Sequence, residues 1–262
     1  MRTDNDKIRR EQKHTDDTAL YIEGRNALKE ALATGTPIER AWILRGDEKA
    51  PVADIKKKLT DRGIPFKEVD RTALERMSKT GHHQGVVARA AAVQYSELDA
   101  AFDLAEKRGA DPFLFMLDGI EDPHNLGAMI RTAEALGAQG VIVGKDRSAP
   151  LSETVVRTSA GAVWHLPIIR VTNLSRTIEE LKKRSVWVVC GDMDGTPLYD
   201  LDLTGPLCLV IGNEGHGVSR LVKEKCDFTA SIPMAGEISS LNASVAAGMI
   251  AYEITRQRAG RK

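Results

Sequence analysis

The sequence has no apolar run that approaches the roughly 20 residues needed for a helix to cross a bilayer. Its first 17 residues are polar and charged, so they lack the apolar core of a secretory signal peptide. We therefore expect a cytoplasmic protein with no membrane partner.

Cysteine is scarce, and its spacing excludes the usual cysteine chemistry. The three cysteines, Cys190, Cys208 and Cys226, form no CxxC pair, and an odd number cannot pair completely in disulfides. We expect buried thiols. His82 and His83 are adjacent, but a metal site needs further ligands, and the sequence offers none near them. They contact RNA or mark the boundary between a helix and a strand, and we expect no metal.

An excess of positive charge is also missing, because 37 Lys+Arg balance 37 Asp+Glu. Proteins that bind nucleic acid by its phosphates usually have a basic surface. The charge is unevenly divided, however: residues 1–95 hold 19 Lys+Arg against 15 Asp+Glu, and residues 96–262 hold 18 against 22. Any electrostatic contact with RNA is therefore expected in the N-terminal part, unless this small excess is an ordinary solvated surface.

The 262 residues, 42% of them hydrophobic, are enough for one or two cores. Residues 1–17 have almost no apolar periodicity, which predicts a disordered tail. Residues 18–95 alternate between helical patterns near 26–33, 52–62 and 72–79 and strand patterns near 41–44, 66–69 and 85–90, which predicts a small α/β domain. The charged residues 96–112 are interpreted as a connecting segment that has room for a short helix.

Residues 113–262 contain apolar strand patterns at 113–117, 140–143, 166–171, 186–190, 207–211 and 229–232, with helices between them. Near-continuous apolar strands are typical of a parallel sheet that is covered on both faces. The last helix, expected at 242–256, carries Val245, Met249 and Tyr252 at helical spacing. These residues are expected to pack on the core, with packing on a partner subunit as the alternative.

Two polar loops follow strands of this sheet. In the first, Asp118-Gly119-Ile120-Glu121-Asp122-Pro123-His124-Asn125, a helix is expected to begin near Asn125, with Arg131 less than two turns further along. In the second, Gly212-Asn213-Glu214-Gly215-His216-Gly217, the glycines permit close backbone approach to a ligand. The simpler alternatives are a helix cap for Asn125, a surface ion pair for Arg131 and a turn-capping carboxylate for Glu214.

A third loop follows the last strand and leads into the last helix through Ser240-Leu241-Asn242. Considered alone, the Ser/Asn pair is best interpreted as a helix cap. Ligands bind open α/β sheets at the carboxyl ends of the strands, and all three loops leave strands at that edge. The order G-x-x-G-x-G in the second loop is not the dinucleotide fingerprint G-x-G-x-x-G, so a nucleotide-dependent oxidoreductase is not supported.

Together, the three loops closely resemble the three motifs of the SpoU branch of the SPOUT methyltransferases, over residues 113–258. The segments Tyr21-Ile22-Glu23-Gly24-Arg25-Asn26-Ala27 and His82-His83-Gln84-Gly85-Val86-Val87-Ala88 resemble the ribosomal-protein-like substrate-binding domain of bacterial 23S rRNA guanosine 2′-O-methyltransferases. The resemblance implies an α/β fold whose C-terminal domain, residues 113–262, is a trefoil-knotted parallel sheet. It also implies S-adenosylmethionine as cofactor and a homodimer that shares its active sites.

The resemblance implies roles for particular residues as well. The catalytic positions match Asn125, Arg131, Glu214, Ser240 and Asn242. The cofactor-binding positions match Gly191, Val210, Ile211, Gly212, Gly215, Ile232, Met234, Leu241 and Asn242. A guanidinium is effectively never deprotonated in a protein, so we expect Arg131 to bind a substrate phosphate or the developing alkoxide, not to act as the base.

The function expected from these observations is ribose 2′-O-methylation of RNA, with a guanosine of 23S rRNA as the first substrate and tRNA as the second. An RNA-binding protein that keeps this fold without catalysing transfer is a further alternative. The presence of all five catalytic motif residues argues against it.

Overall fold

The computed structural model describes residues 20–47, 49–78, 80–237 and 240–260, so the expected tail at 1–17 lies outside the described residues. The chain divides into two compact units, residues 1–93 and 94–262. Within the described part of the chain, no helix is long and apolar enough to cross a membrane.

The first unit is a small α/β unit built on a four-stranded sheet with the order β1-β4-β2-β3. β2 and β3 are parallel, whereas β4 runs antiparallel to both β1 and β2. The helices and strands expected from the sequence are present, and β1 is an additional strand. In chain order the elements are β1 (Leu20–Glu23), α2 (Arg25–Ala33), β2 (Ile38–Leu44), α3 (Ala50–Asp61), β3 (Phe66–Val69), α4 (Arg71–Met77) and β4 (Val86–Ala90).

The second unit contains a six-stranded sheet with the order β10-β8-β9-β5-β6-β7, and every neighbouring pair is parallel. The parallel sheet predicted from the apolar strand patterns is therefore confirmed. Its strands are β5 (Phe113–Asp118), β6 (Gly140–Gly144), β7 (Ile168–Val171), β8 (Trp187–Pro197), β9 (Leu207–Gly212) and β10 (Phe228–Ser231). Its helices are α5 (Asp99–Arg108), α6 (Pro123–Ala135), α7 (Glu153–Thr158), α8 (Leu174–Lys183), α9 (Arg220–Lys223) and α10 (Ala243–Ala259), with short 3-10 turns at Ala162–Trp164 and Leu198–Asp200.

Residues 96–112, expected to connect the two domains, contain α5, which packs on the second unit. Leu98 and Ala101 are buried in the core of that unit, and the backbone N–H of Ser96 donates to the carbonyl of Ile168. The helix ends at Gly109, whose φ of 58° is the left-handed conformation typical of a helix C-terminus.

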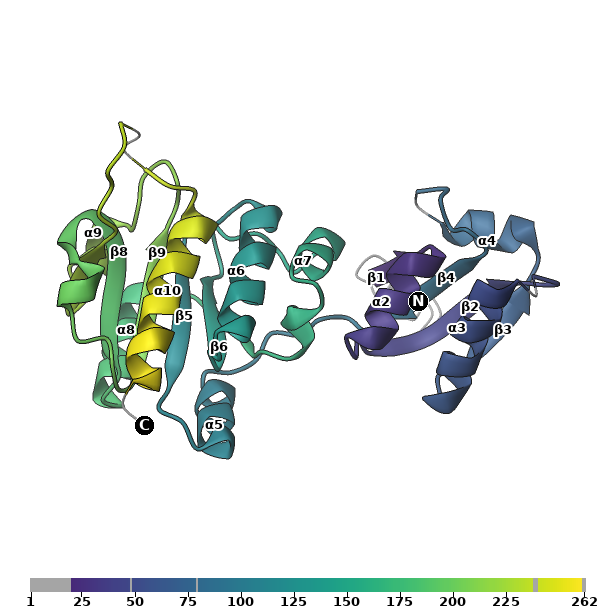
Figure 1. The fold of residues 1–262 in the computed structure, drawn as a ribbon, viewed down its shortest axis with the longest axis horizontal. Coiled ribbons are helices and arrows are strands. Elements are labelled where there is room, and N and C mark those ends of the chain that lie inside the picture. The colour runs from purple at the N-terminus through teal and green to yellow at the C-terminus, as the bar shows by residue number, and fades with distance from the viewer. Residues whose placement is uncertain (1–19, 48, 79, 238–239, 261–262) are drawn as a thin grey trace, which may run out of the picture. The chain divides into compact units, whose positions relative to one another are not determined.

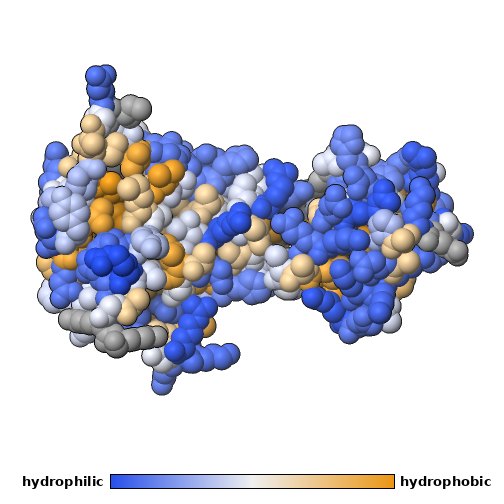
Figure 2. All heavy atoms as spheres, viewed as in Figure 1, coloured by the Kyte–Doolittle hydropathy of each residue, from blue (hydrophilic) through white to orange (hydrophobic). Residues whose placement is uncertain are grey.

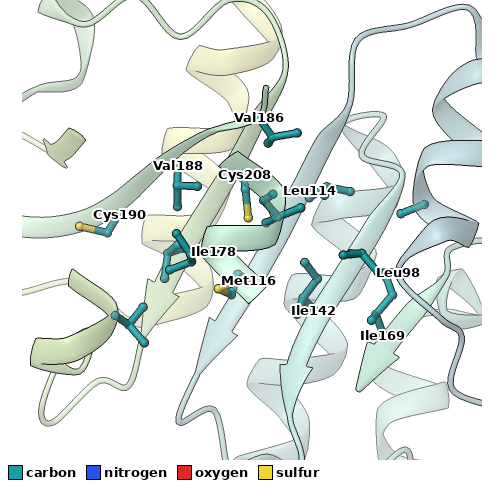
Figure 3. Packing of buried hydrophobic residues seen from close by; sticks show 14 of the residues in the cluster. Leu98, Leu114, Met116, Ile142, Ile169, Ile178, Val186, Val188, Cys190 and Cys208 are labelled. Atoms are coloured by element: carbon teal, nitrogen blue, oxygen red, sulfur yellow. The ribbon is translucent and has the colours of Figure 1, made fainter. Parts of the chain in front are cut away.

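The central strands are buried on both faces because helices cover each side of the sheet. All six residues of β5 and all six of β9 are buried. Figure 3 shows Leu114, Met116, Cys208 and Val188 packing with Ile178 of α8 on one face. Helices α6 and α10 lie against each other, and Figure 1 shows α10 in front of the central strands.

The last helix packs on the core, but with different residues from those expected. Ala247, Ile250 and Ile254 are buried, whereas Val245, Met249 and Tyr252 are 49%, 45% and 63% exposed. The expectation that these three residues face the core is wrong. Figure 2 shows apolar residues at the surface of the unit that carries α10.

Candidate functional site

The carboxyl ends of β5 and β9 lie side by side, since Asp118 pairs with Gly212 in the register of the two strands. The buried carboxylate of Asp118 accepts a hydrogen bond from the backbone N–H of Ser219 at 2.7 Å. This bond ties the end of β5 to the segment that follows β9. The first and second loops predicted from the sequence therefore leave the sheet at the same place.

The first loop is closed by a helix cap, but Asn125 does not provide it. Asp122 is the N-cap of α6 and accepts from the backbone N–H of His124 at 2.9 Å, and Pro123 occupies the first helical position. The interpretation of Asn125 as a cap is therefore wrong. Asn125 stands in the first turn of α6, where its amide points to the other two loops.

The second loop folds back on itself through Asn213. Asn213 and Gly217 exchange two backbone hydrogen bonds, and the Asn213 side chain accepts from the N–H of Gly215 at 2.8 Å and donates to the carbonyl of Gly119 at 2.9 Å. A Cβ at Gly212 would lie 2.1 Å from the backbone carbon of Gly217, so only glycine permits this closure. Asn213, not Glu214, caps the turn.

The third loop ends at Asn242, which is the N-cap of α10. Its Oδ1 accepts from the backbone N–H groups of Ser244 and Val245 at 2.9 and 3.3 Å. The side-chain nitrogen of Asn242 points in another direction, toward the first two loops. One residue thus begins the helix and also joins the three loops.

Asn125, Glu214 and Asn242 form what we call the amide–carboxylate cluster. Asn125 Nδ2 donates to Glu214 Oε1 at 3.1 Å, and Asn242 Nδ2 donates to Glu214 Oε1 and to Asn125 Oδ1. The backbone N–H of Ala243 also donates to Glu214 Oε1, at 3.3 Å. One carboxylate oxygen therefore accepts from all of these groups, and each of the three motif loops contributes one member of the cluster.

A cavity of about 330 Å³ lies beside the cluster and is bounded by the second loop, the third loop, β8 and α10. Its size falls within the range of small-ligand pockets. Apolar side chains and glycines form much of its lining, with Glu214 on one wall. The lining residues are Gly191, Asp192, Met193, Ile211, Gly212, Asn213, Glu214, Gly215, His216, Gly217, Ala230, Ile232, Met234, Ser240, Leu241, Ala243, Ala246 and Ile250.

Most of the residues expected to bind the cofactor lie around this cavity. Gly191, Ile211, Gly212, Gly215, Ile232, Met234 and Leu241 line it. Val210 is fully buried in the core of the sheet and Asn242 belongs to the cluster, and neither is among the lining residues.

The expected catalytic residues divide into three groups. Glu214 and Ser240 line the cavity, whereas Asn125 and Asn242 reach it only through the cluster. Arg131 is exposed on α6, and six residues along a helix place it about 120° around the axis from Asn125. Among the described residues, the Arg131 side chain makes no hydrogen bond or ion pair, so its interpretation as a surface ion pair finds no support there.

Sequence reasoning missed several lining residues. Asp192 and Met193 follow Cys190, where the apolar run of β8 was expected to end, and the strand instead continues to Pro197. The signal was the polar, glycine-rich run Gly191-Asp192-Met193-Asp194-Gly195 directly after an apolar strand. Ala246 and Ile250 were missed because small and apolar side chains in a helix are the usual mark of core packing.

The remaining expectations concern cysteine, histidine and metal. Cys190 and Cys208 are buried and Cys226 is partly buried, all as free thiols. Burial raises the pKa of the Cys208 thiol. His83 is buried and its Nδ1 accepts from the N–H of Gly85 at 3.0 Å, a structural role in the turn before β4. No group of metal-ligating side chains is found in the ranges that the structure describes.

A parallel α/β sheet with a small-ligand cavity and a polar cluster at the carboxyl edge of its strands places the chain in the class of α/β proteins that bind ligands at that edge. Two family matches narrow this class. Residues 112–252 match the SpoU rRNA Methylase family. Residues 21–96 match a second family, which is described as RNA 2′-O ribose methyltransferase substrate binding. The chain belongs to the SpoU methylase family, whose members are RNA methyltransferases that use S-adenosylmethionine as cofactor.

Relatives and solved structures agree with this assignment. YacO of Bacillus subtilis (strain 168), described as a TrmH family tRNA/rRNA methyltransferase, is 46% identical over 239 residues, which cover 91% of this chain and 96% of YacO. The structure of the SpoU methyltransferase AviRb from Streptomyces viridochromogenes in complex with AdoMet matches with a TM-score of 0.74 and 29% identity, over 94% of this chain and 92% of AviRb. An AdoMet-bound rRNA methyltransferase from Sinorhizobium meliloti matches with a TM-score of 0.70 and 28% identity, over 94% of this chain and 90% of that one.

Proposed function

We propose that this RNA methyltransferase transfers the methyl group to a ribose 2′-hydroxyl, that of a guanosine in 23S rRNA, and that the cavity beside the amide–carboxylate cluster binds S-adenosylmethionine. The observation that carries the proposal is the position of Glu214, which lines the cavity and also joins the three motif loops through Asn125 and Asn242. The cavity has the size and the glycine-rich, largely apolar lining that suit an adenosyl ligand. When bound, the cofactor supplies an electrophilic methyl group on a sulfonium.

Transfer to a ribose requires that the 2′-hydroxyl be aligned and lose its proton during attack. Glu214 Oε1 already accepts from Asn125, Asn242 and the backbone of Ala243, so this oxygen is engaged by the motif loops. We therefore assign Glu214 the task of holding the three loops in place around the reacting groups. The proton leaves through a substrate phosphate or water.

Arg131 is assigned to the RNA. Its guanidinium carries five N–H donors, is always charged, and has no partner among the described side chains. It binds the substrate phosphate or the developing alkoxide. Ser240, exposed at the cavity wall, is assigned to positioning the ribose.

The surface of α10 supports the proposal that the protein forms a homodimer. Val245, Met249 and Tyr252 form an exposed apolar stripe on the helix whose other residues, Ala246 and Ile250, line the cavity. Exposed apolar stripes of this kind mark interaction surfaces, and a second copy of the chain would cover this one beside the active site. The first unit is assigned to RNA binding, and the protein to the cytoplasm.

The test is transfer of labelled methyl from S-adenosylmethionine to unmodified 23S rRNA and unmodified tRNA, followed by mapping of the modified nucleotide. The wild type is compared with Arg131→Ala and with the control Arg176→Ala, an exposed arginine on α8. We expect a 2′-O-methylguanosine in 23S rRNA and a loss of at least about 100-fold for Arg131→Ala only. Label in tRNA would identify tRNA as the substrate in place of 23S rRNA. If neither RNA is labelled, a non-catalytic RNA-binding protein would be favoured.

A further inference from the structure

Strand β8 leaves its partner β10 beside the cavity and rejoins it further along. Phe228 and Thr229 pair with Val189 and Cys190, but the next two residues of β10 pair with Thr196 and Pro197. Residues 191–195 of β8 therefore have no counterpart on β10. The rejoining is close, because a Cβ at Gly195 would lie 2.6 Å from the carbonyl oxygen of Thr229. We call residues 191–195 the β8 excursion.

The β8 excursion brings one carboxylate to the cavity wall. Gly191, Asp192 and Met193 line the cavity, and the Asp192 side chain is 20% exposed. Its Oδ2 lies 2.7 Å from Lys223 Nζ on α9, and its Oδ1 accepts from the backbone N–H of Asp194 at 3.2 Å. The carboxylate is thus fixed in direction from two sides and remains open to the cavity.

This carboxylate is ionised and charge-compensated. Partial burial alone would raise the pKa of Asp192, but hydrogen bonds from Lys223 and from the backbone hold that pKa below its usual value. The same pair raises the pKa of Lys223 above its ordinary value. A carboxylate that is already paired with an ammonium group attracts a further cation only weakly, whereas its remaining lone pairs still accept hydrogen bonds from neutral hydroxyl groups.

Asp192 is one of two carboxylates that a ligand's hydroxyl groups would meet among the described lining residues. Among the described residues that line the cavity, the carboxylates are Asp192 and Glu214, and Glu214 Oε1 is occupied by the amide–carboxylate cluster. Apolar side chains, among them Ile232, Leu241 and Ile250, line the same cavity. The charge-compensated acceptor therefore matches the part of an adenosyl ligand that carries two neutral vicinal hydroxyls.

We propose that Asp192, oriented by Lys223, accepts hydrogen bonds from the ribose hydroxyls of S-adenosylmethionine and makes the cavity selective for the ribonucleoside form of the cofactor. This inference rests on the proposed assignment of the cavity as the cofactor site. Asp192 contacts the cofactor, and Lys223 acts through Asp192 as a positioning residue.

The experiment is calorimetric binding of S-adenosylhomocysteine and of its 2′-deoxy and 3′-deoxy analogues to the full chain. For the wild type we expect each deoxy analogue to bind about 10-fold more weakly than the parent compound, the loss typical of one hydrogen bond to a charged group. The Asp192→Ala variant should bind S-adenosylhomocysteine about 10- to 100-fold more weakly than the wild type does. It should bind S-adenosylhomocysteine and the two deoxy analogues with equal affinity. Lys223→Met should give a smaller loss in the same direction.

Controls separate this inference from the assignment of the cavity. Asp200→Asn, which changes an exposed carboxylate outside the cavity lining, should bind like the wild type, and thermal unfolding checks that every variant is folded. Ala246→Phe, which fills the cavity, should abolish binding. Full binding by Ala246→Phe would overturn both the cofactor site and the role of Asp192. Loss of binding by Ala246→Phe together with wild-type discrimination by Asp192→Ala would overturn the role of Asp192 alone.

Discussion

Asn125 and Glu214 are separated by 89 residues in the chain, and the Asn125 amide donates to the Glu214 carboxylate at 3.1 Å. The bond connects the start of α6 to the loop after β9 and lies where Asn242 of the third loop joins them. Because three loops depend on one carboxylate oxygen, substitution of any member of the cluster should affect the same property of the site.

Substitution of Glu214 should reduce methyl transfer without unfolding the protein. In Glu214→Ala, the amides of Asn125 and Asn242 lose their common acceptor, and we expect transfer to fall by about 100-fold or more. Glu214→Gln keeps a carbonyl acceptor and should lose less. The rate of single-turnover methyl transfer would be measured for both Glu214 variants. Glu121→Gln, in the exposed first loop, is the control. Equal losses for Gln and Ala would show that Glu214 acts through its charge and not as an acceptor for the loops.

Gly212→Ala should disrupt the second loop. Its Cβ would lie 2.1 Å from the backbone carbon of Gly217, and backbone cannot move aside as a flexible side chain can. We expect a destabilisation of about 1–3 kcal/mol together with weaker S-adenosylhomocysteine binding. Gly236→Ala is the matched control, since a Cβ there would meet no atom within 4 Å. Urea unfolding and calorimetry measure the two effects, and identical behaviour of the two variants would contradict the close packing at Gly212.

Glu253 should contribute pH-dependent stability. Hydrogen bonds from Arg256, with a further bond from Gln257, lower the pKa of the Glu253 carboxyl to about 2 against an ordinary 4.5. Because the pKa is lower in the folded state, the contribution of Glu253 to folding stability is fully present above about pH 4.5. That contribution is lost as the pH falls toward 2. Glu253→Gln should therefore be less stable than the wild type at pH 7, with the gap narrowing below pH 4.5. Chemical unfolding from pH 7 to pH 3 tests this, and a gap independent of pH would refute it.

The exposed stripe on α10 should control association. Met249→Glu places a charge in the middle of the stripe, and we expect it to shift the protein from dimer to monomer in light scattering at micromolar concentration. The control is Glu179→Lys on α8, which changes an exposed charge elsewhere. A wild type that is monomeric at these concentrations would contradict the dimer directly.

Sequence patterns predicted the strands of the second unit because those strands are buried on both faces, as all six residues of β5 illustrate. They also predicted that the three motif loops would leave the sheet at one edge, since the carboxyl ends of parallel strands share that edge. The choice of Asn125, Glu214 and Asn242 as site residues came from the family resemblance. The orientation of α10 was not predictable in this way. Val245, Met249 and Tyr252 lie on one side and Ala247, Ile250 and Ile254 on another, and a helix that is apolar on both sides does not reveal which side faces the core.

The β8 excursion escaped prediction for a different reason. A polar, glycine-rich run after an apolar strand normally indicates a turn, and no local signal shows that Thr196 and Pro197 resume pairing with β10. The knot and the shared active site of the dimer were inferred from the resemblance alone. No periodicity encodes how a chain threads or which surface a second copy covers.

Asn242 caps α10 with one end of its amide and joins the amide–carboxylate cluster with the other. The same side chain therefore holds the first turn of α10 and the loops that follow β5 and β9. If a second subunit recognises α10, a half-formed site would present a frayed surface to its partner. Dimerisation would then favour chains whose active sites have already assembled.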